Sequence, residues 1–230
     1  MPLTNHILTD ISGTIVHVNI IDQLVDNFRR NGVKNLRSGN EQARKLLEMI
    51  YDTDRIERTE KSAVAYVLEQ IGQRNFQDRY LLLTGVANIP QYIDGTIKPV
   101  LFADVPKAFQ RWTEEKRRIS TYSNGNIDEQ QWILRNSIVV GTNMRSDLTK
   151  YVTRSFGLES GSKTNPDSYA EICDTLGVHP KNVTFLSDRL DELDASRTSG
   201  LSPVLVIRPG NKPFGEHKYR MVTTFDMLSG

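Results

Sequence analysis

The chain has 230 residues, enough for one large domain or for a domain with an insert. Its 29 basic and 28 acidic residues leave a net charge of +1, so no global charge indicates a nucleic acid or an anionic membrane as partner. Cys173, the single cysteine, cannot form an internal disulfide, and no apolar stretch approaches the roughly 20 residues of a spanning helix. The N-terminus has no signal-type pattern. We expect a cytoplasmic protein, and a monomer because the sequence reveals no exposed apolar surface.

Short apolar or β-branched segments alternate with helical patterns along the chain. Buried parallel strands that end in polar or Gly/Pro turns are expected over residues 7–9, 118–123, 183–187 and 204–207. Helix boundaries are indicated by Asp104 as an N-cap, the capping box of Asn126 and Glu129, Asn165 before Pro166, and Gly200 after a helix over 191–199. This alternation predicts an α/β fold with a doubly wound, Rossmann-like parallel sheet and helices on both faces.

Residues 17–96 depart from this alternation. Three segments each place apolar residues on one helical stripe: Ile21, Leu24, Val25 and Phe28; Ala43, Leu46, Leu47 and Ile50; and Val64, Val67, Leu68 and Ile71. We therefore expect a small helical bundle, inserted as a cap (17–96) into an α/β core domain made of residues 1–16 and 97–230. Open α/β sheets bind ligands at the carboxyl edge of their strands, where such an insert could serve as a lid.

Two aspartates at expected strand ends suit metal-assisted phosphoryl transfer. Asp10 follows the first strand and precedes a glycine turn, so it could attack phosphorus and form an aspartyl-phosphate intermediate. Asp188 follows the strand over 183–187, and with one oxygen of Asp10 it could hold Mg²⁺. Waters and a backbone carbonyl would complete the oxygen shell of the ion.

Phosphate-binding groups are expected at the same edge. Ser123 and the backbone amides of Asn124 and Gly125 stand at a helix start and could bind phosphate oxygens. Lys163 would add a positive charge that offsets the repulsion between two carboxylates and a phosphate.

Each of these residues also has a simpler interpretation. An aspartate between a strand and a glycine is often a turn former, Ser-Asn-Gly is a common turn, and a lysine in a Gly-Ser-Lys-Thr-Asn-Pro loop is usually solvated. Four complementary residues at the ends of four expected strands favour a shared active site instead.

The order Asp10, Ser123, Lys163, Asp188 resembles the haloacid dehalogenase superfamily, and most closely its enolase-phosphatases of methionine salvage, the acireductone synthases. The similarity is most specific at residues 104–106, 122–126, 163 with 168–169, 185–188 with 192–195, and 208–211. It covers the first strand and roughly residues 95 to 228. The insert resembles that family's cap only in length and helicity.

The resemblance implies a Mg²⁺-dependent enzyme that enolises a small phosphorylated metabolite, 2,3-diketo-5-methylthiopentyl-1-phosphate, and then removes its phosphate to yield acireductone. It implies that the metal is held by Asp10, the backbone carbonyl of Ser12, and Asp188. It implies that Asp10 is the nucleophile, that Ser123 and Asn124 bind substrate, and that Lys163 steadies the phosphate. Ser187 and Glu192 match the same motif and are expected to act only through other residues.

One departure from the family concerns proton transfer. The family normally has a glutamate at position 12, and related phosphatases an aspartate, to protonate the leaving oxygen and later activate water, whereas this chain has Ser12. A serine hydroxyl does not titrate near neutral pH, and loss of a general acid and base typically costs ~10² to 10⁴ in rate. A second departure is the segment 156–158, Phe-Gly-Leu, which replaces the family's usual aspartate and threonine.

Two alternatives stay open. A haloacid dehalogenase proper would use Asp10 to attack carbon without a metal, although Asp188 would then add an unneeded negative charge. A catalytically weak module that binds a phosphometabolite would follow from the loss of the acid and base at Ser12. Mg²⁺ dependence and turnover distinguish the three.

Overall fold

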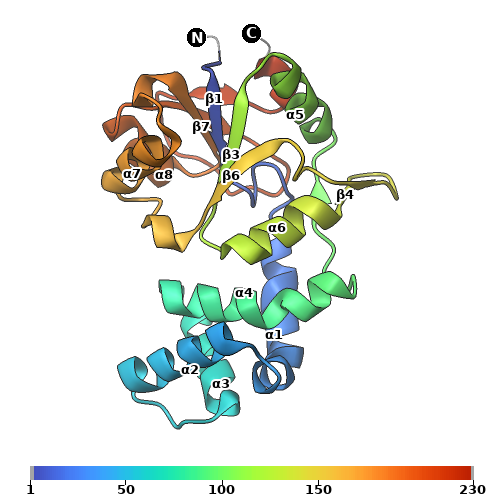
Figure 1. Ribbon diagram of the computed structural model, residues 1–230, viewed down its shortest axis with the longest axis vertical. Coiled ribbons are helices and arrows are strands. Elements are labelled where there is room, and N and C mark those ends of the chain that lie inside the picture. Colours follow the sequence, from blue (N-terminus) through green and yellow to red (C-terminus); the bar gives the residue numbers. More distant parts are fainter. Residues whose placement is uncertain (1–2, 229–230) are drawn as a thin grey trace. The chain divides into compact units, whose positions relative to one another are not determined.

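The computed structural model describes residues 3–228, which form two compact units (Figure 1). One unit contains the chain up to Asn19 together with the chain from Pro99 onward, and the other is Ile20–Lys98. The first is called the core unit and the second the helical unit below. Within residues 3–228 no helix has both the length and the apolar character needed to cross a membrane.

A six-stranded parallel sheet forms the centre of the core unit. Its strand order is β6-β3-β1-β7-β8-β9. The strands are β1 (His6–Thr9), β3 (Arg118–Tyr122), β6 (Val152–Phe156), β7 (Val183–Ser187), β8 (Ser202–Val206) and β9 (Arg220–Val222). Every neighbouring pair in this sheet is parallel. The predicted α/β fold with a doubly wound sheet is confirmed.

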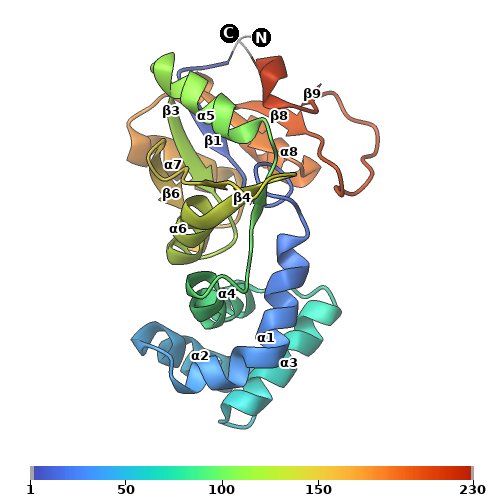
Figure 2. The same ribbon diagram turned by 90° about the vertical axis from the view of Figure 1, so that its right-hand side faces the viewer.

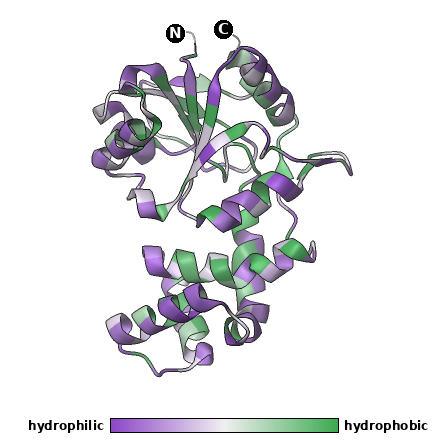
Figure 3. Cartoon of the chain, in the orientation of Figure 1, coloured by the Kyte–Doolittle hydropathy of each residue, from purple (hydrophilic) through white to green (hydrophobic). Residues whose placement is uncertain are grey.

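Burial along the strands follows their position in the sheet. All residues of the central strands β1 and β7 are buried, and Figure 3 shows hydrophobic residues along the inner strands. The edge strands β6 and β9 each expose two residues. Strands buried on both faces are the reason the sequence shows short continuous apolar runs instead of strict alternation.

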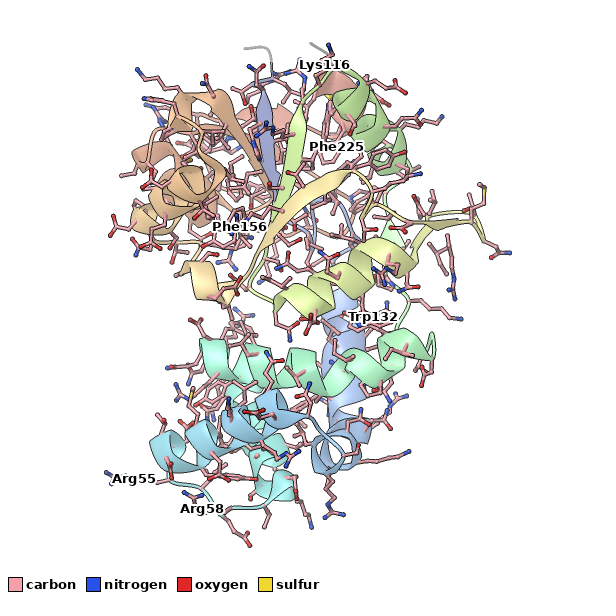
Figure 4. The ribbon with its side chains drawn as sticks, viewed as in Figure 1. Arg55, Arg58, Lys116, Trp132, Phe156 and Phe225 are labelled. Atoms are coloured by element: carbon pink, nitrogen blue, oxygen red, sulfur yellow. The ribbon has the colours of Figure 1, made fainter. Side chains whose placement is uncertain are left out.

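Helices cover both faces of this sheet (Figures 1 and 2). The helices α7 (Pro166–Leu176) and α8 (Leu190–Thr198) lie on one face, and α5 (Val105–Glu114) and α6 (Ile127–Asn136) on the other. Beneath α7, Tyr169 packs edge-on against Tyr122 of β3 and Phe185 of β7, with ring centroids 5.5 and 5.1 Å apart. On the other face, Trp112 packs against Phe225, which Figure 4 labels, at 5.2 Å.

A second, smaller sheet adjoins the places where the chain leaves and re-enters the core unit. Its order is β2-β4-β5, with β2 (Val100–Leu101), β4 (Ser137–Val139) and β5 (Arg145–Ser146). Val16 pairs with Leu101, and the amide of His17 donates to the carbonyl of Val100 at 2.8 Å. This sheet and β9 were not predicted, because their short sequences show no buried-strand pattern.

The predicted helix starts are at the expected places, with one correction. Asn126 caps α6 by accepting a hydrogen bond from the amide of Glu129 at 2.6 Å, and Asn165 caps α7 before Pro166. Gly200 follows α8 with φ of +87°, as a helix stop should. Asp104 stands at the start of α5, but its side chain makes no cap hydrogen bond. Its carboxylate instead accepts from Arg208, so the predicted capping role is wrong.

The helical unit contains four helices, α1 (Ile20–Arg37), α2 (Glu41–Asp54), α3 (Glu60–Gly72) and α4 (Asp78–Ile93). Its core gathers the expected stripes of α2 and α3 with Phe28 of α1 and Tyr80 and Leu83 of α4. The expected stripe of α1 is partly wrong, because Ile21 is 46% exposed. Instead, α1 buries Asn27 and Asn35 against α4, where they bond Asn88 and the carbonyl of Ala87.

A partly buried ion pair ties α2 to α4 inside the helical unit. Arg79 donates to both oxygens of Asp54, at 2.8 and 2.6 Å, and the Tyr80 hydroxyl donates to the same carboxylate at 2.8 Å. Hydrogen bonds from Arg79, the largest cause, lower the pKa of Asp54 below its ordinary value, so the carboxylate stays charged at neutral pH. Arg58, in the loop after α2 (Figure 4), is by contrast an exposed cation with Glu48 and Asp52 as partners.

Candidate active site

The carboxyl ends of three neighbouring strands lie at one edge of the sheet. Thr9, the last residue of β1, is in register with Thr121 of β3 and with Leu186 of β7. The residues that follow these strands therefore share that edge. Asp10 comes directly after β1, Ser123 directly after β3, and Asp188 directly after β7. The amide of Asp10 still donates to the carbonyl of Leu186 at 2.8 Å, which extends the ladder into the site.

The carboxylate of Asp10 is buried and held on both oxygens. Lys163 Nζ lies 2.5 Å from Oδ1, and the Thr14 hydroxyl donates to Oδ2 at 3.2 Å. Only 9% of the Asp10 side chain is exposed. Two contacts from different segments restrict its rotation, which is what a positioned nucleophile requires.

Lys163 is buried between two carboxylates, not solvated. Its side chain is 3% exposed, and its ammonium lies 2.7 Å from Oε2 of Glu192 as well as against Asp10. Burial lowers the pKa of Lys163, but the charges of Asp10 and Glu192 outweigh this effect and raise it above the ordinary value. The Ser187 hydroxyl donates to the same Glu192 oxygen at 2.7 Å. Lys163 is therefore a permanent cation at this site.

The loop that carries Lys163 is anchored through its backbone. The Tyr169 hydroxyl donates to the carbonyl of Lys163 at 2.7 Å, and the Tyr122 hydroxyl donates to that of Gly161 at 2.8 Å. The sequence predicted that Lys163 stands at the end of a strand, and the structure corrects this. Lys163 lies in the loop between β6 and α7, beyond the short 3-10 helix Leu158–Ser160.

Asp188 approaches the backbone of the turn after β1. Gly13 has φ of +79°, and a Cβ atom there would lie 2.5 Å from Oδ2 of Asp188. Burial raises the pKa of the Asp188 carboxyl to about 7, and the negative charges of Asp10 and Glu192 add to that shift while Lys163 opposes it. Only a glycine leaves room for the carboxylate, so the turn and Asp188 form one packed unit.

The oxygen atoms gathered here fit a hard cation. The carboxylates of Asp10 and Asp188 repel each other electrostatically. Nearby, Oδ1 of Asn211 is buried without a hydrogen-bond partner in the described chain, 3.3 Å from the position of a Cβ on Gly13. Within residues 3–228 no group of three or more His, Cys, Asp or Glu side chains could share a metal. A site here would draw on two carboxylates and the backbone carbonyl of Ser12, a donor set that suits Mg²⁺.

The turn after β3 leads into the amino terminus of α6. The backbone amide of Ser123 donates to the carbonyl of Phe156, the last residue of β6 (Figure 4). The Ser123 hydroxyl accepts a hydrogen bond from the backbone amide of Gly125 at 3.3 Å. Asn124 is half-buried. A Cβ on Gly157 would lie 2.9 Å from the carbonyl oxygen of Gly125, so the unusual glycine after β6 permits close packing against this turn.

Several contacts around Asp10 were not expected from the sequence. Thr14 bonds the carboxylate, and Glu192, expected to act only through other residues, bonds Lys163 directly. Arg208 and Asn211 donate to the carbonyls of Thr14 and Gly13. The segment 208–211 was noticed only through family resemblance. Its place just after β8, a strand of the same parallel sheet, was the signal that could have indicated a role at this edge.

The chain matches the model of one protein family over most of its length. The model of the haloacid dehalogenase-like hydrolases matches residues 4–200. The chain belongs to this family. The match includes the helical unit, the core unit up to residue 200 and every candidate site residue, although the family model by itself assigns no substrate.

The relatives in this family include enolase-phosphatases. The chain is 34% identical over 150 residues to enolase-phosphatase E1 of Anopheles gambiae, which covers 64% of this chain and 49% of that protein. It is 28% identical over 251 residues to the enolase-phosphatase E1 of Drosophila pseudoobscura pseudoobscura, covering 99% of this chain and 97% of that protein. For the first of these, the matched part spans about half of the relative's length.

Solved structures of the family share the fold. The UTR4 protein of Saccharomyces cerevisiae has a TM-score of 0.74 and 26% identity, covering 98% of this chain and all of the other. A haloacid dehalogenase-type phosphatase from Thermococcus onnurineus has a TM-score of 0.62 and 15% identity, covering 99% and 96%. CbbY from Rhodobacter sphaeroides, solved with phosphate, has a TM-score of 0.60 and 14% identity, covering 98% and 96%.

The close approach of Asp188 to Gly13 predicts a large effect of Gly13→Ala on stability. Both Gly13→Ala and Gly141→Ala would force alanine to a positive φ, at a cost of about 1–2 kcal/mol, but Gly141 has open space around its missing Cβ. Gly13→Ala should lose about 1–3 kcal/mol more, because the added carbon overlaps the Asp188 carboxylate. Urea unfolding followed by tryptophan fluorescence measures this in the core unit, which holds both tryptophans, Trp112 and Trp132. Equal losses in the two variants would contradict the packed arrangement.

Proposed function

We propose that this protein is a Mg²⁺-dependent phosphatase that acts through an aspartyl-phosphate at Asp10. The observation that carries the proposal is the buried Asp10 carboxylate, held by Lys163 and Thr14 at the carboxyl edge of the sheet. A carboxylate with one buried cation beside it can act as a nucleophile toward an anionic phosphate, because the cation offsets the repulsion.

In the first step, a carboxylate oxygen of Asp10 forms a bond to phosphorus, and the bond from phosphorus to the leaving oxygen breaks. The leaving oxygen keeps the electron pair and takes a proton from solvent water. In the second step, water attacks the same phosphorus and gives a proton to solvent, the bond to Asp10 breaks, and inorganic phosphate leaves. Lys163 faces the phosphoryl oxygens in both steps, while Ser123 and the amides of Asn124 and Gly125 hold the phosphate at the start of α6.

Mg²⁺ would be held by Asp10, Asp188 and the carbonyl of Ser12, and when bound it supplies positive charge that stabilises the transferring phosphoryl group. The residues of this chain orient the nucleophile whether or not the ion is present. Asp188 would have to be ionised to take part, so its raised pKa opposes metal binding at acidic pH.

We propose the diketo-methylthiopentyl phosphate of methionine salvage as substrate, which is enolised by transfer of a proton from carbon to a carbonyl oxygen before its phosphate is removed, with acireductone as product. The named relatives support this choice, since both insect proteins are enolase-phosphatases. The helical unit enters the chain directly after the turn that carries Asp10, which supports a role as the cap that selects the organic half of the substrate. A cytoplasmic location and a monomeric state stay predictions.

Ser12 favours a second candidate, a weak phosphatase that mainly binds a phosphometabolite. Ser12 is half-buried in the turn after Asp10, and its hydroxyl cannot serve as an efficient acid and base. A metal-free dehalogenase gains less support, because the carboxylate of Asp188 raises the negative charge beside Asp10 with no use in that chemistry.

The proposed function is tested by phosphate release from the diketo-methylthiopentyl phosphate and from an aryl phosphate, with Mg²⁺ and with EDTA. Release should require Mg²⁺ and fall at least about 10³-fold in Asp10→Asn, because the amide is not a nucleophile. Preference for the first substrate would support methionine salvage. Absence of release from both, with Mg²⁺-dependent binding of either ligand retained, would favour the binding protein.

A glutamate at position 12 should restore proton transfer. We expect Ser12→Glu to raise the steady-state rate with the diketo-methylthiopentyl phosphate by about 10²- to 10⁴-fold, since a carboxyl group can both donate and accept the proton. Ser12→Ala is the matched control and should leave the rate close to that of the wild type. A large loss in Ser12→Ala would instead show that the serine hydroxyl itself takes part.

The raised pKa of Asp188 predicts how metal binding depends on pH. At pH values between about 4, the pKa of the Asp188 carboxyl in the unfolded chain, and about 7, its pKa in the folded chain, the folded protein keeps a proton on this group that the unfolded chain has lost. The stability that this group contributes therefore falls as pH rises through that range. Mg²⁺ should raise the melting temperature more at about pH 8 than at about pH 5, because it binds the ionised carboxylate. Asp188→Asn should lose most of this fall in stability with pH and most of the rise in melting temperature with Mg²⁺. A melting temperature that still rises with Mg²⁺ as in the wild type would argue against Asp188 as a ligand.

A further inference from the structure

The segment that follows β8 contacts the nucleophile turn at two backbone positions. Arg208 Nε donates to the carbonyl of Thr14 at 3.0 Å, and Asn211 Nδ2 donates to the carbonyl of Gly13 at 3.0 Å. The amide of Asn211 also donates to the carbonyl of Arg208 at 3.1 Å, which closes the segment into a turn. Two side chains of one short turn therefore hold two consecutive peptide groups of another.

Arg208 is itself fixed in place. Its side chain is 3% exposed, and its guanidinium lies 4.6 and 4.5 Å from the ring centroids of Phe102 and Phe225, which flank it. Nη1 donates to Asp104 Oδ1 at 2.9 Å and to the carbonyl of Thr223 at 3.0 Å. Asp104 is held in turn by the amide of Phe225 at 2.6 Å. A planar guanidinium with ring contacts and several directed bonds cannot be replaced by an ammonium without losing some of them.

The nucleophile turn needs these donors. The amides of Thr14, Ile15 and Val16 all donate to the carbonyl of Ile11, which curls the turn on itself. The carbonyls of Gly13 and Thr14 point away from these bonds and must find donors elsewhere, since buried peptide oxygens are rarely unpaired. Arg208 and Asn211 supply them.

Thr14 links Arg208 to the carboxylate of Asp10. Its carbonyl accepts from Arg208, and its hydroxyl donates to Oδ2 of Asp10. Only one residue therefore separates the guanidinium from the nucleophile. Asn211 reaches Gly13, whose backbone lies against Asp188. Movement of the 208–211 turn would shift both aspartates.

We propose that Arg208 and Asn211 are positioning residues, which hold the turn from Asp10 to Thr14 in the geometry that phosphoryl transfer requires. The inference rests on the proposed phosphatase function for its effect on rate, but its structural part stands apart from it. Displacement of a nucleophile by about 1 Å can cost about 10²-fold in rate, so a residue without substrate contact can still control turnover.

The test compares Arg208→Lys with Arg117→Lys in the full chain. Arg117 is a matched control, because its Nη1 donates to the carbonyls of Leu3 and Thr4 and its Nε to Glu115. It thus bonds backbone carbonyls ahead of β1, at the end of the strand away from Asp10. Asn211→Ala is a second variant with a smaller change, in case Arg208→Lys does not fold.

Hydrogen exchange of the peptide that spans residues 8–17 gives a readout independent of activity. We expect its amides to exchange about tenfold faster in Arg208→Lys and in Asn211→Ala than in the wild type, and to be unchanged in Arg117→Lys. With an aryl phosphate, kcat should fall about 10- to 100-fold in the first two variants with KM within about twofold, because the phosphate-binding groups are untouched.

Exchange and kcat that match those of Arg117→Lys would overturn the proposal. A rise in KM at constant kcat would also overturn it, because it would mean that the turn binds substrate instead of orienting Asp10. A wild-type chain that releases no phosphate would refute the proposed function alone, and the exchange comparison would still decide whether the two side chains hold the turn.

Discussion

The buried ammonium of Lys163 is the interaction on which the rest of the site depends. It lies within 2.7 Å of the buried carboxylates of Asp10 and Glu192, and a buried charge needs such partners. Its place is set by the Tyr122, Tyr169 and Phe185 ring cluster beneath it and by the tyrosine hydroxyls that bond its loop. The charge of the site is therefore supported by the hydrophobic packing of α7 on the sheet.

The two sides of the site differ in how their acceptors are satisfied. On the Lys163 side, each carboxylate has a cation and a hydroxyl donor within hydrogen-bond distance. On the Asp188 side, a carboxylate with a raised pKa and the unpartnered Asn211 oxygen lie against the turn at Gly13. Acceptors exceed donors there, which is the electrostatic condition for binding a hard cation. The proposed metal would supply positive charge to the oxygen atoms on the Asp188 side.

Ser12 stands where the family resemblance leads us to expect an acidic residue. In the proposed function, Lys163 and Thr14 orient Asp10 and offset the charge of a phosphate, whereas Ser12 offers only a hydroxyl for proton transfer. Attack on phosphorus and the later hydrolysis depend to different degrees on that group, because a good leaving oxygen needs little protonation while water needs a base. In the proposed function, the balance between catalysis and binding of a phosphometabolite therefore depends on the residue at position 12.

The sequence by itself determined the alternation of strands and helices, the helical stripes of α2 and α3, and the strand ends before Asp10, Ser123 and Asp188. This was possible because buried parallel strands are continuous apolar runs, and because parallel strands bring their carboxyl ends to one edge. Only the tertiary structure decided the rest. Lys163 bonds Asp10, which lies 153 positions away in the sequence. Asp104 bonds Arg208 instead of capping α5. In α1, Ile21 is exposed and Asn27 is buried. These outcomes follow from contacts between distant segments, which local periodicity does not contain.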